Sequence, residues 1–238
     1  MISKLKEGPD MNFGRLDIAA GELTDIFASK NELRALDAGA YAKMRYPKLI
    51  PMMRFWVKRF AAAEFGNVFS MYTKAMGGMM QLCTIVFTPN RGADVPLLLI
   101  DIMAFGKKRA AFVEYYDCTK NRLPQAELTA VKEKYASLAD YPEKPAWYIG
   151  ERTDFSLIKG GADEDALCAM LRDSLSAYAD VCAAANVRRA ENIEGLGAFI
   201  ERMVKEGNPS GATLKRVLGD RGAKDFFRYA IMPKEYND

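Results

Sequence analysis

The chain of 238 residues contains no histidine. This absence excludes the Ser-His-Asp and Cys-His nucleophile pairs and every zinc site that needs an imidazole ligand. No C-x-x-C spacing occurs among the four cysteines, Cys83, Cys118, Cys168 and Cys182, so neither a zinc ribbon nor a thioredoxin-like motif is available. We expect no bound metal, and we interpret the cysteines as the reduced thiols of a cytoplasmic protein.

The glycine-rich signatures of nucleotide binding are also missing. No G-x-G-x-x-G follows a strand pattern, and no G-x-x-x-x-G-K-[ST] occurs. A redox enzyme with this sequence would therefore take its electrons from an external donor. No run approaches the roughly 18 apolar residues of a membrane span, and the N-terminus lacks the apolar region of a signal peptide, so we expect neither a membrane partner nor export.

The composition is that of a soluble globular protein. Half of the residues are hydrophobic and 27% are charged, and the formal net charge is only +3. The sequence contains no internal repeat, no low-complexity tract and no long Pro/Gly/Ser linker. These features predict a single domain that spans residues 1–238.

One stretch of the chain is strongly basic. Residues 41–63 contain no acid, and aromatic side chains are interleaved there with six cations, which are Lys43, Arg45, Lys48, Arg54, Lys58 and Arg59. Such a patch steers an acidic partner toward the protein, with an effect that fades as salt is added. A solvated helix face is an equally good interpretation. We expect no nucleic acid, because no RNP, helix-turn-helix or zinc-finger signature accompanies the patch.

The hydrophobic pattern changes from helical to extended and back to helical along the chain. After an irregular start, residues 22–30 and 51–63 are predicted to form helices. Four extended runs follow between residues 67 and 118, and their separators, at 77–78, 89–94 and 106–108, are too short for parallel crossovers. The runs therefore predict an antiparallel meander, with a further strand at 154–159.

Beyond residue 161 the pattern is helical. A long helix is predicted to begin at the N-cap Asp163, and a second is predicted at 193–205, ending at Gly207. Two shorter helices are expected at 213–218 and 223–230. Strands in the middle with helices at both ends predict a mixed α/β (α+β) fold, an α/β/α sandwich with a central, mostly antiparallel sheet flanked by helices.

Asp101 is the residue that points most directly to chemistry. It interrupts the apolar run LLLIDIM, whose continuous hydrophobicity indicates a strand that is covered on both faces. Burial raises the pKa of a lone carboxyl, and carboxyls perturbed in this way are acid/base candidates. The alternative is a structural aspartate that reaches a sheet edge or pairs with an arginine such as Arg109.

Two further polar residues stand where a ligand could be held. Lys159 follows the apolar run FSLI and precedes two glycines, so its charge emerges at a strand end, where it meets a ligand carboxylate or is merely solvated. Asn208 lies in the turn GNPSG, where an asparagine before proline is most often a turn former.

From about residue 66 to the C-terminus, the chain resembles the ferredoxin-dependent bilin reductases, the phycocyanobilin:ferredoxin oxidoreductase-like enzymes that reduce linear tetrapyrroles. The central segment MQLCTIVFTPNRGADVPLLLIDIMAF is similar to a pattern of this family, with Pro89, Pro96 and Asp101 in the same relative register. The later order of PAW, a strand ending in the base Lys159, a long helix, and GNPSG before LKRVLGD is also similar to the family.

The resemblance implies a pocket between the sheet and the C-terminal helices, which holds a biliverdin-type bilin without any bound cofactor. Reduced ferredoxin, or flavodoxin, would deliver single electrons to the bilin through a radical intermediate. Asp101 matches the proton-donating aspartate of the family, and Asn208 matches a second polar site, where an amide orients the substrate. Lys159 would bind a propionate, with Lys215 or Arg216 as a second partner.

The sequence departs from the branch of the family that makes phycocyanobilin. That branch uses a histidine and a glutamate on the two preceding strands, where this chain has Thr84 and Tyr72. Neither of these side chains relays protons in that way, so the resemblance favours a two-electron over a four-electron reduction.

The resemblance also gives the basic stretch a candidate partner, because ferredoxins are acidic. A monomer is expected, as is usual for small members of the family. The alternative function is a non-catalytic protein of the same fold that binds a bilin or haem.

Overall fold

The computed structural model describes residues 15–50, 52–62, 65–89, 92–119, 125–185 and 190–233. Residues 1–14 of the expected irregular start lie outside this range, whereas residues 15–21, which were expected to be irregular as well, are helical. An eight-stranded antiparallel sheet has the order β1-β3-β4-β5-β6-β7-β8, and β1 and β2 pair with opposite ends of β3. The strands are β1 (Leu33–Leu36), β2 (Lys43–Tyr46), β3 (Met53–Ala62), β4 (Gly66–Ala75), β5 (Met80–Thr88), β6 (Leu97–Phe105), β7 (Lys108–Tyr116) and β8 (Leu157–Gly160).

The predicted meander is confirmed. The four extended runs between residues 67 and 118 are β4, β5, β6 and β7, which pair consecutively and antiparallel. The strand predicted at 154–159 is β8, which pairs with β7. The connection from β6 to β7 is a tight turn in which Gly106 has a φ of 56°, a conformation that glycine adopts without steric cost.

The helix predicted at 51–63 is wrong. The described part of this segment is strand β3, which pairs with β4 over its whole length. Phe55 and Val57 are buried on one face of β3, whereas Arg54 and Lys58 alternate with them on the other face. This alternation has the period of two residues that is typical of a strand, although a run of alanines obscures it at the C-terminal end.

The α-helices are α1 (Arg15–Ala28), α2 (Ala126–Lys134), α3 (Glu164–Ala184), α4 (Ala190–Glu206) and α5 (Gly211–Phe226). The helix predicted at 22–30 is the second half of α1, and α2 was not predicted. The side chain of Asp163 caps α3 by accepting a hydrogen bond of 3.0 Å from the amide of Ala166, as predicted. The two short C-terminal helices are found as α5, interrupted at Gly219 with φ 76°, and a π-helix at Phe227–Ile231.

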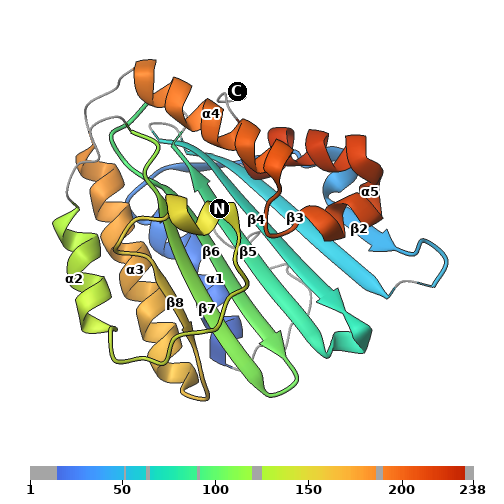
Figure 1. The fold of residues 1–238 in the computed structure, drawn as a ribbon, viewed down its shortest axis with the longest axis horizontal. Coiled ribbons are helices and arrows are strands. Elements are labelled where there is room, and N and C mark those ends of the chain that lie inside the picture. The colour runs from blue at the N-terminus through green and yellow to red at the C-terminus, as the bar shows by residue number, and fades with distance from the viewer. Residues whose placement is uncertain are drawn as a thin grey trace.

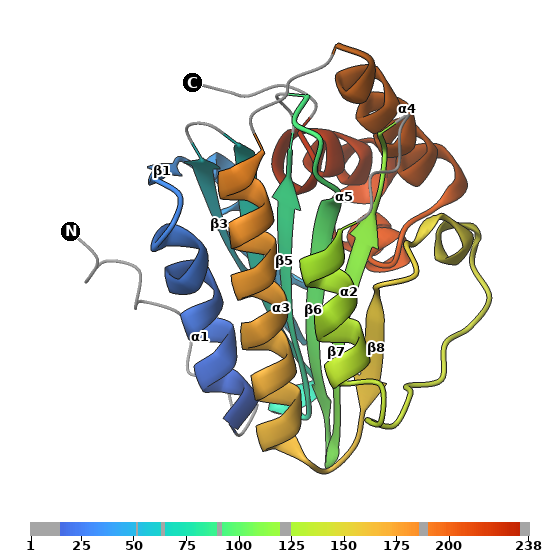
Figure 2. The same ribbon diagram turned by 90° about the vertical axis from the view of Figure 1, so that its left-hand side faces the viewer.

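Each face of the sheet carries its own hydrophobic core, so the predicted α/β/α sandwich is confirmed. In β6, Leu98, Ile100 and Ile102 face the core with α1 and α3, whereas Leu97 and Leu99 face the core with α4 and α5. Figure 2 shows α1, α3 and α2 side by side over one face of the sheet. Figure 1 shows α4 and α5 on the opposite side, toward one end of the strands.

Within the described residues, no helix has both the length and the apolar composition that are needed to cross a membrane.

Candidate functional site

Asp101 lies on the face of the sheet that is covered by α4 and α5. The strand register places it directly opposite Thr84 of β5 and Phe112 of β7, so all three side chains lie on this face. The hydroxyl of Thr84 donates a hydrogen bond to the carboxylate of Asp101. Two of the residues that the sequence singled out are therefore in direct contact.

A small cavity lies between this part of the sheet and the C-terminal helices. Its lining combines polar groups with an apolar wall, and the residues are Thr84, Leu99, Asp101, Met203, Asn208, Pro209, Ser210, Phe227, Ile231 and Met232. The volume of the cavity is about 10 Å³, which is room for about one water molecule. The fold thus brings together Asp101, Thr84 and Asn208, which are 124 positions apart at most in the sequence.

Asn208 is held in the turn between α4 and α5. Its side-chain amide donates a hydrogen bond of 3.1 Å to the carbonyl of Met203, and the indole of Trp147 donates one of 2.9 Å to the carbonyl of Gly207. The amide oxygen of Asn208 is buried and is one of the described side-chain atoms that lack a hydrogen-bond partner. A buried acceptor without a donor is costly, so this oxygen is ready to accept an N–H from a ligand.

Burial raises the pKa of Asp101 from its usual 3.8 to about 6, although the hydrogen bond from Thr84 and the positive charge of Arg152 both lower it. The alternative in which Asp101 pairs with Arg109 is wrong. Arg109 lies on the other face of the sheet, and its guanidinium is 2.9 Å from the carboxylate of Glu164.

Sequence reasoning missed the neighbours that surround Asp101. Glu114 of β7 lies on the same face, two residues beyond Phe112, and its side chain is only 3% exposed. Its carboxylate pairs with Arg152, whose side chain is 8% exposed and also pairs with Glu143 at 2.6 Å. Glu114 interrupts the apolar run AAFVEYY just as Asp101 interrupts its own strand, so the same signal was present in the sequence.

Tyr72 and Lys159 lie on the opposite face of the sheet from Asp101. Tyr72 pairs with Cys83, whereas Met71 is the residue of β4 that lies opposite Thr84. Lys159 pairs with Ala111, and its ammonium donates to the carbonyls of residues 136 and 138 and to the carboxylate of Asp140. The structure therefore does not bring Tyr72 or Lys159 to the cavity.

Lys215 lies in the first half of α5, outside the residues that line the cavity. Its side chain is 55% exposed, and its ammonium is 3.1 Å from the carboxylate of Asp220. Arg216 beside it is exposed as well. Both cations are thus at the surface of the helical layer that covers the site.

The basic stretch forms two strands and the turn between them. Four of its six cations, Lys43, Arg45, Arg54 and Lys58, lie on the sheet face opposite Asp101, whereas Arg59 is buried on the same face as Asp101. Arg45, Arg54 and Lys74 lie directly opposite one another on β2, β3 and β4. In Figure 1, β2 and the adjoining half of β3 extend beyond α1 and α3.

Among the described residues, no group of three or more Cys, Asp or Glu side chains is arranged to hold a metal ion.

No protein-family model matches the chain, and no curated protein matches it either. Among solved structures, the chain is similar to selenomethionine-labelled phytochromobilin synthase from tomato in complex with biliverdin, with a TM-score of 0.73 and 13% sequence identity. The match covers 92% of this chain and 82% of that chain. The chain therefore has the fold of phytochromobilin synthase, and the resemblance to the bilin reductases that the sequence indicated is confirmed at the level of the fold.

Proposed function

We propose that this protein reduces one double bond of a biliverdin-type bilin with electrons from reduced ferredoxin. Two electrons and two protons are added to the bilin in this reaction. The observation that carries the proposal is the position of Asp101, a carboxyl with a raised pKa in a cavity between the sheet and the C-terminal helices, in a fold shared with a biliverdin-bound protein.

Each polar residue of the cavity has a separate role in this proposal. Asp101 donates a proton to the bilin after an electron has arrived, because its raised pKa keeps part of the population protonated near neutral pH. Thr84 positions the carboxyl of Asp101 through its hydrogen bond. The unpartnered amide oxygen of Asn208 accepts a hydrogen bond from a pyrrole or lactam N–H and so orients the substrate.

Binding of a bilin requires the cavity to widen. Ligand pockets have volumes of roughly 300–1,000 Å³, far above the 10 Å³ between the sheet and the turn at Asn208. We propose that α5 and the preceding turn move outward, with Gly207 (φ 111°) and Gly219 (φ 76°) as the points where the backbone bends. The exposed ammonium of Lys215 would then lie at the rim, where a solvent-facing propionate ends.

The outer face of β2 and β3 is the proposed docking site for ferredoxin. Like charges directly opposite one another on a sheet repel, so the row of Arg45, Arg54 and Lys74 favours an acidic partner. Trp56 and Tyr72 lie opposite each other on this outer face, in the row next to the one that contains Thr84 and Asp101. An electron delivered there would cross the sheet and the offset of two strands, about 10 Å, between β4 and β6.

The test is anaerobic mixing of the purified protein with biliverdin, followed by addition of a reduced ferredoxin system while the absorption spectrum is recorded. We expect a spectral change on binding, then a radical band, and then a blue-shifted product. Asp101→Asn should bind biliverdin and accept the first electron without forming product. Lys159→Met is the matched control, and it should turn over like the wild type because Lys159 faces the other side of the sheet.

Each other outcome has a defined meaning. Binding of biliverdin without turnover by the wild type would replace the proposal with the non-catalytic binding protein of the same fold. The absence of any spectral change on mixing would refute a biliverdin site in this chain.

A further inference from the structure

The proposed reduction consumes two protons, and the cavity lining contains a single carboxyl. Among the residues that line the cavity, Asp101 is the acid, whereas Thr84 and Asn208 do not release a proton near neutral pH. A second proton must therefore come from a group behind the cavity or from solvent. The cluster around the buried carboxyl of Glu114, which includes Tyr116, Glu143 and Arg152, supplies a candidate.

Glu114 is the nearest carboxyl to Asp101 along the sheet. Phe112 lies directly opposite Asp101, and Glu114 is the next residue of β7 on the same face, which is the diagonal position at about 7–8 Å between backbones. The hydroxyl of Tyr116 donates a hydrogen bond of 3.2 Å to the carboxyl of Glu114. Burial raises the pKa of Glu114 from its usual 4.5 to about 8, and the charge of Asp101 adds to this rise, whereas the charge of Arg152 opposes it.

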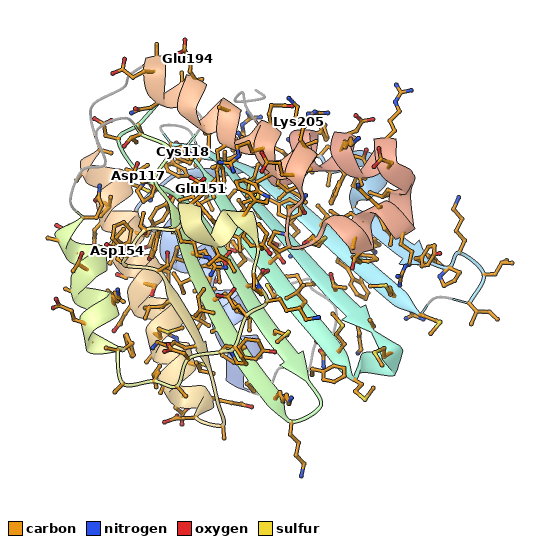
Figure 3. The ribbon with its side chains drawn as sticks, in the orientation of Figure 1. Asp117, Cys118, Glu151, Asp154, Glu194 and Lys205 are labelled. Carbon is orange, nitrogen blue, oxygen red and sulfur yellow. The ribbon has the colours of Figure 1, made fainter. Side chains whose placement is uncertain are left out.

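Arg152 is fixed at Glu114 by its backbone and by its neighbours. It pairs with Tyr116 in a single β-bridge directly after the 3-10 turn at Trp147–Glu151. Figure 3 shows Glu151 of this turn close to Asp117 and Cys118 at the end of β7. Arg202 of α4 binds Glu151 at 2.7 Å, so the turn is tied to the helical layer as well.

The charges of the cluster do not balance. The ionisable groups that face Glu114 are Asp101 of β6, Tyr116 of β7, and Glu143, Tyr148 and Arg152 of the segment between α2 and β8. The three carboxyls of Asp101, Glu114 and Glu143 thus share the one guanidinium of Arg152. Both terminal nitrogens of this guanidinium already donate hydrogen bonds to Glu143, at 2.6 and 2.8 Å. Ionisation of all three would leave buried negative charge without a partner, so the cluster retains a proton.

We propose that Glu114 is the proton reserve of the site, which reprotonates Asp101 after Asp101 has given its first proton to the bilin. This inference rests on the proposed reduction. In the step, Asp101 has lost its proton to the reduced bilin and is a carboxylate. Glu114 then passes its own proton to Asp101 and becomes the carboxylate, which the guanidinium of Arg152 and the hydroxyl of Tyr116 stabilise.

The second electron drives this transfer. Negative charge that arrives on the bilin beside Asp101 disfavours the ionised form of that carboxyl and raises its affinity for a proton. Asp101 then takes the proton from Glu114 and delivers it to the bilin. Over the two steps the bilin gains two electrons and two protons, and Asp101 and Glu114 end as carboxylates. Solvent then restores both protons. Water has access to the cluster at Glu143, whose side chain is 24% exposed.

The first test does not depend on turnover. Infrared spectra of the ligand-free protein in D2O are recorded from pH 5 to 10 to follow the C=O band of a protonated carboxyl. We expect a component of this band in the wild type that disappears with a midpoint near pH 8 and is absent in Glu114→Gln, in which only the Asp101 component with a midpoint near pH 6 remains. Two matched variants keep the carboxyl: Tyr116→Phe should move the midpoint to higher pH, and Glu143→Gln should move it to lower pH.

The second test measures the reaction itself. In Glu114→Gln the first bilin radical should form at the wild-type rate, whereas its conversion to product should slow by about tenfold or more, the lower end of what a positioned acid contributes. Conversion at the wild-type rate would refute the reserve role. A component near pH 8 that is unchanged in Glu114→Gln would refute it as well. A wild type that shows this component but does not reduce biliverdin would refute the proposed function, on which the reserve role rests, and would leave the protonated buried carboxyl of Glu114 established.

Discussion

Replacement of Asp101 by asparagine should stabilise the ligand-free protein above pH 6. The carboxylate of Asp101 costs free energy in the folded state because burial disfavours its charge. The rise of its pKa from 3.8 to about 6 corresponds to a cost of about 3 kcal/mol once the group is ionised in both states. Because the side chain is partly exposed to the cavity, we expect about 1–3 kcal/mol from the substitution.

The sign of this effect follows from proton binding. Below pH 4 Asp101 is protonated in both the folded and the unfolded protein, so the substitution should have little effect on the free energy of unfolding. Between pH 4 and 6 the folded protein binds more protons, and the wild type loses stability relative to Asp101→Asn as the pH rises. Above pH 6 to 7 the full difference remains. Asparagine keeps the acceptor for the hydroxyl of Thr84.

Urea unfolding at pH 4, 6 and 8 measures this difference directly. A gain of about 2 kcal/mol at pH 8 would also raise the melting temperature by about 4–8 °C for a chain of this size. Equal stabilities of the two proteins at every pH would refute a strained carboxyl at Asp101. Destabilisation that is the same at pH 4 and 8 would show that asparagine disturbs the packing instead.

Three further outcomes are expected. Lys159→Met should leave biliverdin affinity within twofold of the wild type, measured by absorption titration, but lower the free energy of unfolding by about 1–3 kcal/mol because the three hydrogen bonds of the buried ammonium, to Ala136, Leu138 and Asp140, are lost. Thr84→Val should raise the pKa of Asp101, because it removes a hydrogen bond that stabilises the carboxylate form. The rise would be seen as an upward shift of the pH profile of product formation. Arg54→Glu should raise the KM for ferredoxin several-fold at low salt, whereas Lys205→Glu, on the helical layer, should not.

The sequence predicted the middle of the fold because its strands are long and joined by short turns. The runs from β4 to β7 are bounded by glycine-rich or proline-containing turns, and so their antiparallel pairing required no knowledge of distant contacts. β3 was mistaken for a helix because its alternation is blurred by alanines. β1 and β2 are only four residues long each, and it is their pairing with β3 that makes them strands.

The candidate site shows where prediction from a single strand fails. Tyr72 was chosen as the counterpart of a family glutamate, but one residue of register moves a side chain to the other face of the sheet, and Met71 lies opposite Thr84. Lys159 was expected at a strand end with a free charge. Its carbonyl and carboxylate partners come from the loop after α2, a segment whose position depends on tertiary structure.

Asp101 and Asn208 were recognised for different reasons, and the structure explains why one line of reasoning was stronger. A carboxyl in a strand covered on both faces is unusual in any fold, so Asp101 was visible from hydrophobicity alone. An asparagine before proline in a turn is common, and its significance appears only when the turn is found beside Asp101 with a buried oxygen that lacks a donor. Glu114 has the same sequence signature as Asp101, an acid within an apolar strand.

Asp101 and Glu114 lie on the same face of two adjacent strands. Their proximity suggests how this chain obtains protons without the histidine of the phycocyanobilin branch. Thr84 cannot relay a proton, but its hydrogen bond holds Asp101 toward the cavity, while the acid that Thr84 does not provide is present one strand beyond Asp101, at Glu114. The two carboxyls ionise at different pH values, because burial raises the pKa of Asp101 to about 6 and that of Glu114 to about 8, where the charge of Asp101 adds to the rise. A site with two such acids matches the proton demand of a two-electron reduction, and each further double bond would require solvent to recharge both of them.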